Sequence, residues 1–328
     1  MRAGVVGGGS WGTALGCLLA RKGVQTRLWA RDGEALARMT GSRTNERYLP
    51  GVVFPESLEL TGRLEDVAEG TVVLCVPTRA QRELARRLAG LGRSRAVLCA
   101  AKGYEPETRK RMSEVLREEL GKDACVAVLA GPSHAEEVAR SIPTSVVVAS
   151  EDEACARHFQ ELLLDATFRV YTNPDLLGVE TAAALKNVIA IAAGVCDGLG
   201  FGDNTKGALL TRGLAELSRL GRALGARPET FSGLAGIGDL VTTCTSVHSR
   251  NRRLGELVAR GVPLEDACAR IGMAVEGIGT TRSALAIAAT SGVELPITQQ
   301  VAHVLFEGRE PRKALGELMT RDAKAEVR

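Results

Sequence analysis

GVVGGGSWGTALG, residues 4–16, is the segment from which the fold class can be inferred first. A short apolar run ends at three glycines, of which Gly7 and Gly9 join Gly12 in the spacing G-x-G-x-x-G, and a helix-like segment follows over 14–21. One glycine permits the sharp turn, one lets the backbone approach a pyrophosphate, and one lets helix and strand pack closely. The helix would hold the pyrophosphate at its free N–H groups. The stretch predicts a dinucleotide site, although glycine-rich turns also occur for structural reasons alone.

The composition is that of an ordinary globular protein and excludes several function classes. With 42 basic and 39 acidic residues, the net charge of +3 excludes a strongly basic nucleic-acid surface. The four scattered histidines have no metal-ligand spacing, so we expect no metal. The eight cysteines never form C-x-x-C, and we expect a reduced, cytoplasmic protein. Lys186 and Asn187 interrupt the alanine-rich stretch 181–196, so we expect no membrane span.

Short β-branched runs alternate with helix-like segments through the first half of the chain. The expected strands are 2–6, 25–29, 71–76, 96–100, 125–130, 144–149 and 167–171. Such alternation predicts an α/β fold with a Rossmann-like, doubly wound parallel sheet. The pattern stops near Asn173-Pro174, and only helical periodicity follows, as in 206–224, 250–260, 264–271 and 280–291. We expect a dinucleotide-binding domain over 1–173 and an all-helical domain over 174–328.

The second expected strand leads into Ala30-Arg31-Asp32. Ligands of an open α/β sheet collect beyond the carboxyl ends of its strands, where an acid binds the ribose 2′-hydroxyl of NAD. Arg31 could instead hold the 2′-phosphate of NADP. Because the acidic Asp32 stands next to Arg31, the segment is compatible with NAD as well as with NADP. Arg31 could also be a solvated loop residue. We favour NADPH over NADH.

Two further strand ends carry polar residues. Lys102 follows the run 96–100 and could point into a crevice between domains or lie on the surface. After the run 125–130, Ser133 and Glu136 have the spacing of a capping box, which predicts a helix start that is also suited to an anion. His134 lies between them, but no partner is evident and we assign it no role.

Lys186 lies in a segment, 179–193, whose helical projection is apolar on nearly every side. Burial would lower the pKa of this lysine toward the range that is useful for proton transfer. The alternative is that its stem snorkels to solvent. Downstream, the glycine-rich segment 233–240 carries a single carboxylate, Asp239. Asp239 could cap a helix, or it could face Lys186 and stabilise its ammonium.

Ser249 is a plausible N-cap for an amphipathic helix that begins at Arg250. Arg250 and Asn251 occupy the first turn, where free N–H groups and a guanidinium converge on a phosphate. Arg252 and Arg253 better fit a solvent-facing basic patch. Their positive charges oppose the helix dipole, which also suggests an anion nearby.

Taken together, these motifs resemble the NAD(P)-dependent glycerol-3-phosphate dehydrogenases of the soluble bacterial type. The resemblance spans nearly the whole chain and implies reversible reduction of dihydroxyacetone phosphate to sn-glycerol 3-phosphate, in supply of phospholipid precursors, by a homodimer. The segments on which the resemblance rests are GGGSWGTALG at 7–16, AAKG at 100–103, AGPSHAEE at 130–137, AAALKNVIAIAAG at 182–194, GLAGIGDLVTTCT at 233–245, SRNRR at 249–253 and VEG at 275–277.

The resemblance also implies residue roles. Lys186 would be the proton donor and acceptor at the C2 oxygen, and Lys102 and Asp239, with Thr243 as a further candidate, would complete its polar network. Cofactor contacts would come from Gly7, Gly9, Ser10, Trp11, Gly12, Arg31, Lys102, Ala135, Arg250 and Glu276. Substrate contacts would come from Lys102, Gly131, Ser133, Lys186, Asp239, Ser249, Arg250 and Asn251.

Two rival functions remain open at this point. β-Hydroxyacid dehydrogenases and ketopantoate reductases also combine a dinucleotide fold with a helical domain and a lysine. The phosphate site at Ser249, Arg250 and Asn251 is the feature that argues against them. A non-catalytic NADPH sensor would use the same glycines, but it would need neither Lys186 nor Asp239.

Overall fold

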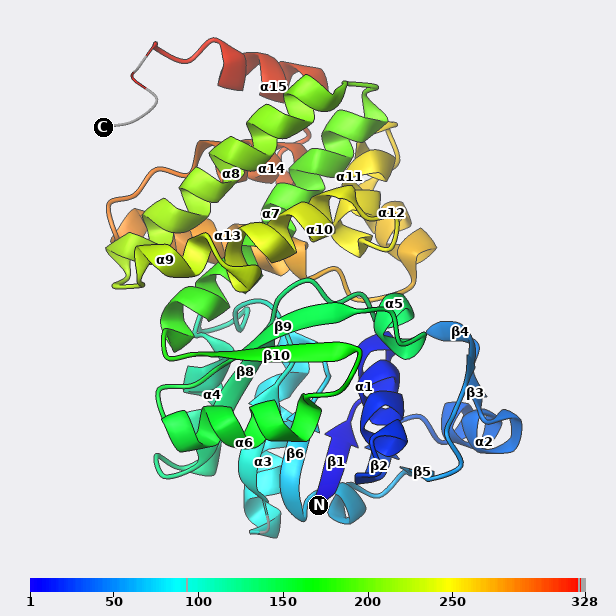
Figure 1. Cartoon of the computed structure of the whole chain (residues 1–328). Coiled ribbons are helices and arrows are strands. Elements are labelled where there is room, and N and C mark those ends of the chain that lie inside the picture. Colours follow the sequence, from blue (N-terminus) through cyan, green and yellow to red (C-terminus); the bar gives the residue numbers. More distant parts are fainter. Residues whose placement is uncertain (93, 324, 326–328) are drawn as a thin grey trace.

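The computed structural model describes residues 1–92, 94–323 and 325, and it has a sheet-containing half and a helical half (Figure 1). The main sheet has eight strands in the order β10-β9-β8-β7-β6-β1-β2-β5. Neighbouring strands are parallel except β8 and β9. The predicted doubly wound fold is therefore confirmed. The strands are β1 (Arg2–Val6), β2 (Gln25–Trp29), β5 (Leu58–Thr61), β6 (Gly70–Leu74), β7 (Ser94–Cys99), β8 (Cys125–Ala130), β9 (Thr144–Ala149) and β10 (Phe168–Asn173).

Helices cover both faces of this sheet because the strands are apolar on both sides. Side chains of α1 and α6 join one buried cluster, and those of α3 and α4 join the other. The helices of this half are α1 (Ser10–Arg21), α2 (Gly33–Ser42), α3 (Thr78–Leu91), α4 (Met112–Leu120), α5 (Ala135–Ala139) and α6 (Glu153–Leu163), with a 3-10 turn at Leu64–Val67.

Three strands were not expected from the sequence. β3 (Thr44–Asn45) and β4 (Leu49–Val53) form an antiparallel hairpin, and β5 adds an edge to the main sheet. β4 reads LPGVV, and its proline and glycine obscure the alternation typical of a strand. The hairpin stands beside α2 and reaches α1 and α5 (Figure 1).

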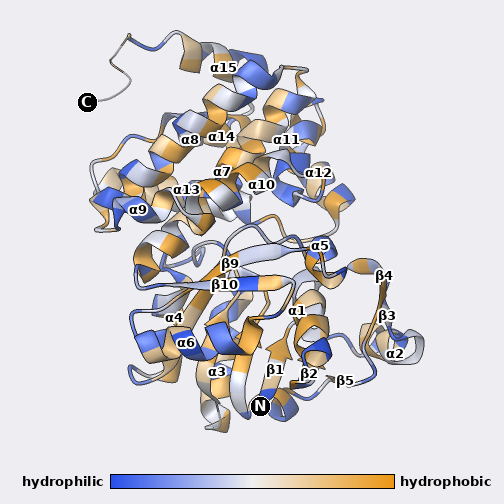
Figure 2. Cartoon of the chain, viewed as in Figure 1, coloured by the Kyte–Doolittle hydropathy of each residue, from blue (hydrophilic) through white to orange (hydrophobic). Residues whose placement is uncertain are grey.

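From Leu176 onward, every regular element that the structure describes is a helix. The central one, α7 (Leu176–Gly198), is largely apolar in Figure 2. It is long and apolar enough to cross a membrane, but 94% of that apolar window is buried inside the protein, so α7 is a core helix. The others are α8 (Asp203–Ala223), α9 (Pro228–Phe231), the π-helical turn η2 (Leu234–Gly238), α10 (Asp239–Thr245), α11 (Arg250–Ala259), α12 (Leu264–Ile271), α13 (Glu276–Thr290), α14 (Pro296–Phe306) and α15 (Pro311–Met319).

Two glycines let α7 and α11 approach each other closely. A Cβ on Gly194 would lie 1.8 Å from the carbonyl oxygen of Arg252, and one on Gly255 would lie 2.0 Å from that of Ile191. Neither distance leaves room for a side chain. This contact draws the first turn of α11 toward the middle of α7, where Lys186 lies.

One expectation about the cysteines is wrong. Cys125, at the start of β8, and Cys155, in α6, form a disulfide, whereas we expected reduced cysteines. The pairing is set by the packing of α6 on the sheet, which brings the two Cα atoms to 5.5 Å. The sequence separation of 30 residues gave no indication of this.

Candidate active site

The glycine loop has the geometry that its spacing predicts. Gly7 has a φ of +123°, and a Cβ on Gly12 would lie 1.9 Å from the carbonyl oxygen of Gly7. A Cβ on Gly9 would meet nothing within 4 Å among the described residues, so its surroundings are open to a ligand. Gly9 precedes α1 without a side-chain cap, which leaves the first-turn N–H groups of Ser10 and Trp11 available. The loop therefore fits a dinucleotide pyrophosphate.

The carboxyl end of β2 separates the roles of its two charged residues. Asp32 is the N-cap of α2, and its Oδ1 accepts a 3.0 Å hydrogen bond from the Ala35 amide. Arg31 is exposed and, among the residues that the structure describes, makes no hydrogen bond or ion pair. Asp32 is thus engaged in capping, while the guanidinium of Arg31 is available.

A buried polar cluster joins the two halves of the chain. Asp239 is 1% exposed, and its carboxylate lies between two ammonium groups. Lys186 Nζ donates to Asp239 Oδ1, and it also donates to Thr243 Oγ1 at 2.7 Å. Lys102 Nζ donates to Asp239 Oδ2 at 2.9 Å. The structure therefore brings together the three predicted catalytic residues and Thr243.

The electrostatics of this cluster suit proton transfer near neutral pH. Burial lowers the pKa of Lys186 to about 7, with Asp239 opposing the shift and Lys102 reinforcing it. Burial alone would raise the pKa of Asp239, but Lys102 and Lys186 outweigh it and hold this pKa below its usual range. Lys186 does not snorkel to solvent, because it is only 4% exposed. An acid with a pKa close to the operating pH both gives and takes a proton readily.

Asn187 is a site residue to which the sequence analysis gave no role. Its Nδ2 donates to the carbonyl oxygen of Lys102 at 3.0 Å, and its Oδ1 accepts from Asn251 Nδ2 at 3.0 Å. Asn251 Oδ1 in turn accepts from the Gly277 amide at 3.0 Å. This chain of bonds ties the Lys102 loop to α7, α11 and α13. The available signal was a second polar residue directly after Lys186 in an otherwise apolar helix.

The start of α11 carries the predicted phosphate residues. Ser249 is its N-cap, and Ser249 Oγ accepts from the Arg252 amide at 3.3 Å. Burial lowers the pKa of Arg250, with Glu276 and Glu136 opposing that shift. Arg252 does not belong to a solvent-facing patch, because its guanidinium pairs with Asp197 at 2.6 Å and Glu256 at 2.8 Å.

The loop after β8 differs from its expected local structure. Ser133 and Glu136 do not form a capping box, because α5 begins at Ala135 and His134 occupies its N-cap position. Ser133 Oγ instead donates to the carbonyl oxygen of Gly131 at 2.9 Å, which also accepts from Lys102 Nζ at 2.9 Å. Gly131 has a φ of +108°, a conformation that turns the chain toward the lysines.

His134 lies near the cluster, 5.8 Å from His248 between ring centroids. Burial lowers the pKa of His134 to about 4, and the charges of Lys186 and Lys102 lower it further. This imidazole is uncharged at neutral pH and therefore cannot act there as an imidazolium acid.

Glu276 connects the two halves at a second point. Its carboxylate accepts from the Thr78 amide at 3.0 Å and from Thr78 Oγ1 at 2.8 Å. Thr78 begins α3, and three residues separate it from the carboxyl end of β6, so Glu276 lies over the sheet edge at which a bound dinucleotide would extend.

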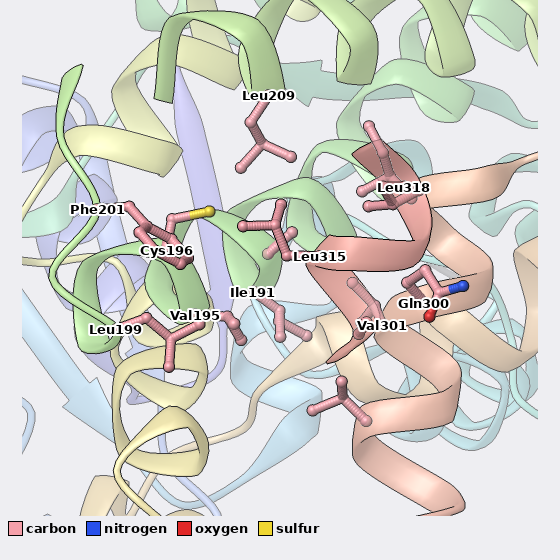
Figure 3. Close-up of a pocket in the computed structure, with 14 residues that line it drawn as sticks. Ile191, Val195, Cys196, Leu199, Phe201, Leu209, Gln300, Val301, Leu315 and Leu318 are labelled. Carbon is pink, nitrogen blue, oxygen red and sulfur yellow. The ribbon is translucent and has the colours of Figure 1, made fainter. Parts of the chain in front are cut away.

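The pocket in Figure 3 is of a different kind. It lies toward the C-terminal end of α7, and its lining is almost entirely apolar, with Ile191 and Val195 from α7, Leu209 from α8, and Leu315 and Leu318 from α15. These side chains offer neither a proton donor nor a cation for a phosphate. The chemistry therefore belongs to the polar cluster.

Models of one protein family match both halves of the chain. The N-terminal model of NAD-dependent glycerol-3-phosphate dehydrogenase covers residues 2–156, and the C-terminal model covers residues 175–316. The chain belongs to this dehydrogenase family. The predicted resemblance is confirmed, and the rival families and the non-catalytic sensor are set aside.

Individual members of the dehydrogenase family agree with this over nearly the full chain. Two relatives named glycerol-3-phosphate dehydrogenase (NAD(P)+) are each 50% identical. The one from Pelotomaculum thermopropionicum aligns over 98% of this chain and 93% of its own, and the one from Geobacillus kaustophilus over 98% and 95%. The crystal structure of glycerol-3-phosphate dehydrogenase from Coxiella burnetii superposes with a TM-score of 0.93 at 40% identity, and covers 98% of this chain and 99% of that chain.

Proposed function

We propose that this dehydrogenase reduces dihydroxyacetone phosphate to sn-glycerol 3-phosphate, and catalyses the reverse reaction, with Lys186 as the proton donor and acceptor. The observation that carries the proposal is the buried Lys186 ammonium, held by Asp239 and Thr243 and with a pKa of about 7. When bound, the nicotinamide supplies or accepts the hydride at C2. Lys186 gives its proton to the C2 oxygen in the reduction and takes it back in the oxidation, so one hydride and one proton account for the change.

The neighbours of Lys186 have separate tasks in this scheme. Asp239 holds Lys186 and Lys102 in place, and the two ammonium groups stabilise the negative charge that develops on the C2 oxygen. Gly131 and Ser133 contact the substrate beside Lys102.

The substrate phosphate binds at the start of α11. Ser249 fixes the helix start, Arg250 supplies the positive charge, and Asn251 aligns this turn with Asn187. A guanidinium beside free N–H groups of a first helical turn matches the geometry of a phosphate.

The cofactor lies along the glycine loop and the carboxyl edge of the sheet. Gly7, Gly9 and Gly12 admit its pyrophosphate. The remaining contacts come from Ser10, Trp11, Arg31, Lys102, Ala135, Arg250 and Glu276. The orphaned indole N–H of Trp11, which is buried without a partner among the described residues, supports this placement. NADPH is favoured over NADH, because Asp32 is engaged in capping α2 and Arg31 is unpaired.

The proposed function also carries expectations for the domain boundary, the oligomeric state and the location of the enzyme. The dinucleotide-binding domain ends at residue 173 and the helical domain begins at 174, which agrees with the end of β10 at Asn173 and the start of α7 at Leu176. The enzyme acts as a cytoplasmic homodimer and supplies glycerol phosphate for phospholipid synthesis. Size-exclusion chromatography with light scattering tests the dimer.

A spectrophotometric assay tests the proposal directly. Oxidation of NADPH and of NADH is followed side by side with dihydroxyacetone phosphate, with unphosphorylated dihydroxyacetone and with a 2-keto acid. We expect turnover with the phosphorylated ketone, faster at low NADPH than at equally low NADH. Turnover with the keto acid but not with dihydroxyacetone phosphate would overturn the assignment.

A further inference from the structure

The β3–β4 hairpin is fastened to the glycine loop by one buried amide. Asn45 is 3% exposed, and its Nδ2 donates to the carbonyl oxygen of Gly8 at 3.0 Å and to Thr13 Oγ1 at 2.8 Å. Gly8 itself packs against the end of β2, because a Cβ there would lie 2.9 Å from the Cβ of Ala30. The hairpin therefore has a fixed position over the loop that fits the pyrophosphate, next to the strand end that carries Arg31.

The tip of this hairpin presents an exposed guanidinium. Arg47 lies 5.1 Å above the ring centroid of Tyr48, a cation–π contact that orients its side chain. The positive charge of Arg47 also acts on Asp32. The Ala35 amide is the main cause that holds the pKa of Asp32 below its usual range, and Arg38 and Arg47 lower it further. The anchored hairpin therefore brings the positive charge of Arg47 to bear on the strand end that carries Arg31 and Asp32.

Of the three arginines near the end of β2, one is paired with a carboxylate and two are not, among the described residues. Arg38 pairs with Glu34 at 3.6 Å. Neither Arg31 nor Arg47 has a carboxylate within 4 Å in the part of the chain that the structure describes. Arg31 follows the end of β2, and the charge of Arg47 acts on its neighbour Asp32. Both guanidiniums, unpaired among the described residues, therefore belong to the region beyond β2, where the adenosine ribose of a dinucleotide lies in this kind of sheet.

We propose that Arg47, held over the glycine loop by Asn45, forms with Arg31 a two-arginine subsite for the 2′-phosphate of NADPH. The proposal rests on the cofactor preference given under the proposed function. A phosphate monoester carries about 1.5 to 2 negative charges at neutral pH and three acceptor oxygens, which suits two guanidiniums better than one. The 2′-hydroxyl of NADH is uncharged, so Arg47 selects between the two cofactors.

The test measures dissociation constants for NADPH and NADH by fluorescence titration, which needs no turnover. It compares the unchanged protein with Arg47→Ala, Arg31→Ala and Arg38→Ala. Arg47→Ala is expected to weaken NADPH binding about tenfold, the scale of one charge-assisted hydrogen bond, and to leave NADH within about twofold. Arg38→Ala is the matched control, because it removes a neighbouring arginine that Glu34 already neutralises.

The outcomes separate this proposal from the one on which it rests. If Arg31→Ala loses the NADPH preference and Arg47→Ala keeps it, the two-arginine subsite is overturned and the cofactor preference stands. If neither variant changes the preference, the subsite is overturned and Arg31 is excluded as its basis. If the unchanged protein binds NADH as tightly as NADPH, the cofactor preference itself fails. An equal loss in Arg38→Ala also overturns the subsite, because it would show a diffuse positive field rather than two placed groups.

A second variant tests the anchor without removing a charge. Asn45→Ala keeps both guanidiniums but releases the hairpin from Gly8 and Thr13, so we expect part of the NADPH preference to be lost. Full retention of the preference in a folded Asn45→Ala protein would overturn the anchoring role.

Discussion

Asp239→Asn replaces the carboxylate between the ammonium groups of Lys186 and Lys102 with a neutral amide of nearly the same shape. Because Asp239 is 1% exposed and Lys186 is also buried, water does not compensate the Lys186 ammonium. Breaking a buried ion pair costs about 3–5 kcal/mol. Lys186 relieves part of this cost by losing its proton, since its pKa is already about 7. We expect the free energy of unfolding to fall by about 2–4 kcal/mol at neutral pH.

The size of this loss should depend on pH in one direction. The pKa of Lys186 is about 7 in the folded protein against 10.5 for an ordinary lysine, and without Asp239 it falls further. Consider a pH below the folded-state pKa of Lys186 in both the unchanged protein and the variant. There, each unit by which the variant's pKa is lower costs about 1.4 kcal/mol of stability. At a pH above both values Lys186 is neutral in either folded protein, and this part of the loss vanishes. The variant is therefore more destabilised in mild acid than in mild base.

Urea unfolding in mild acid and in mild base, together with kcat/KM for ketone reduction, measures both effects. At neutral pH the variant should lose about tenfold in kcat/KM for each unit by which the pKa of Lys186 falls, because the proton donor is deprotonated. Asp175→Asn is the control. Asp175 is also buried, but it accepts hydrogen bonds from the Gly178 and Arg227 amides rather than from an ammonium. Equal destabilisation at both pH values, with normal kcat/KM, would refute the role of Asp239.

Three other predictions concern the same molecule. Lys186→Ala should lower kcat by about 10²- to 10⁴-fold, the contribution of a positioned acid, while the dissociation constant for NADPH stays unchanged; near-normal turnover would remove Lys186 from the mechanism. Arg250→Ala should raise KM for dihydroxyacetone phosphate about tenfold or more, and an unchanged KM would contradict its phosphate role. Gly255→Ala places a Cβ 2.0 Å from the Ile191 carbonyl oxygen and should cost about 1–3 kcal/mol in urea unfolding; a fully stable variant would show that α7 and α11 can separate without cost.

Local chemistry made much of the fold predictable. The apolar runs and intervening helices identified seven of the main strands, because strands buried on both faces read as continuous β-branched segments. β3 and β5 were missed because they are short, and β4 was missed because Pro50 and Gly51 interrupt it. The capping box predicted at Ser133 was wrong because α5 begins at Ala135, and Ser133 instead bonds to the carbonyl oxygen of Gly131, which also accepts from Lys102.

Long-range contacts were beyond the reach of local patterns. The disulfide of Cys125 with Cys155 depends on how α6 lies against β8. The role of Asn187 depends on three segments distant in sequence that meet at its amide. Likewise, nothing in the sequence near Asn45 indicates that its side chain bonds to Gly8, because the two residues meet only when the hairpin folds back over the loop.

Local sequence was enough to predict the glycine loop, the alternating strands and helices, and the unusual burial of Lys186, since each depends on residues within a few turns of chain. The tertiary structure was needed to show that Lys186, Lys102 and Asp239 form one cluster and that Asp32 caps a helix while Arg31 stays free. Charge pairing and burial depend on distances between segments that are far apart in the sequence. In this protein those distances are set by the close contact of α7 with α11 and by the bond between Lys102, at the sheet edge, and Asp239, at the start of α10.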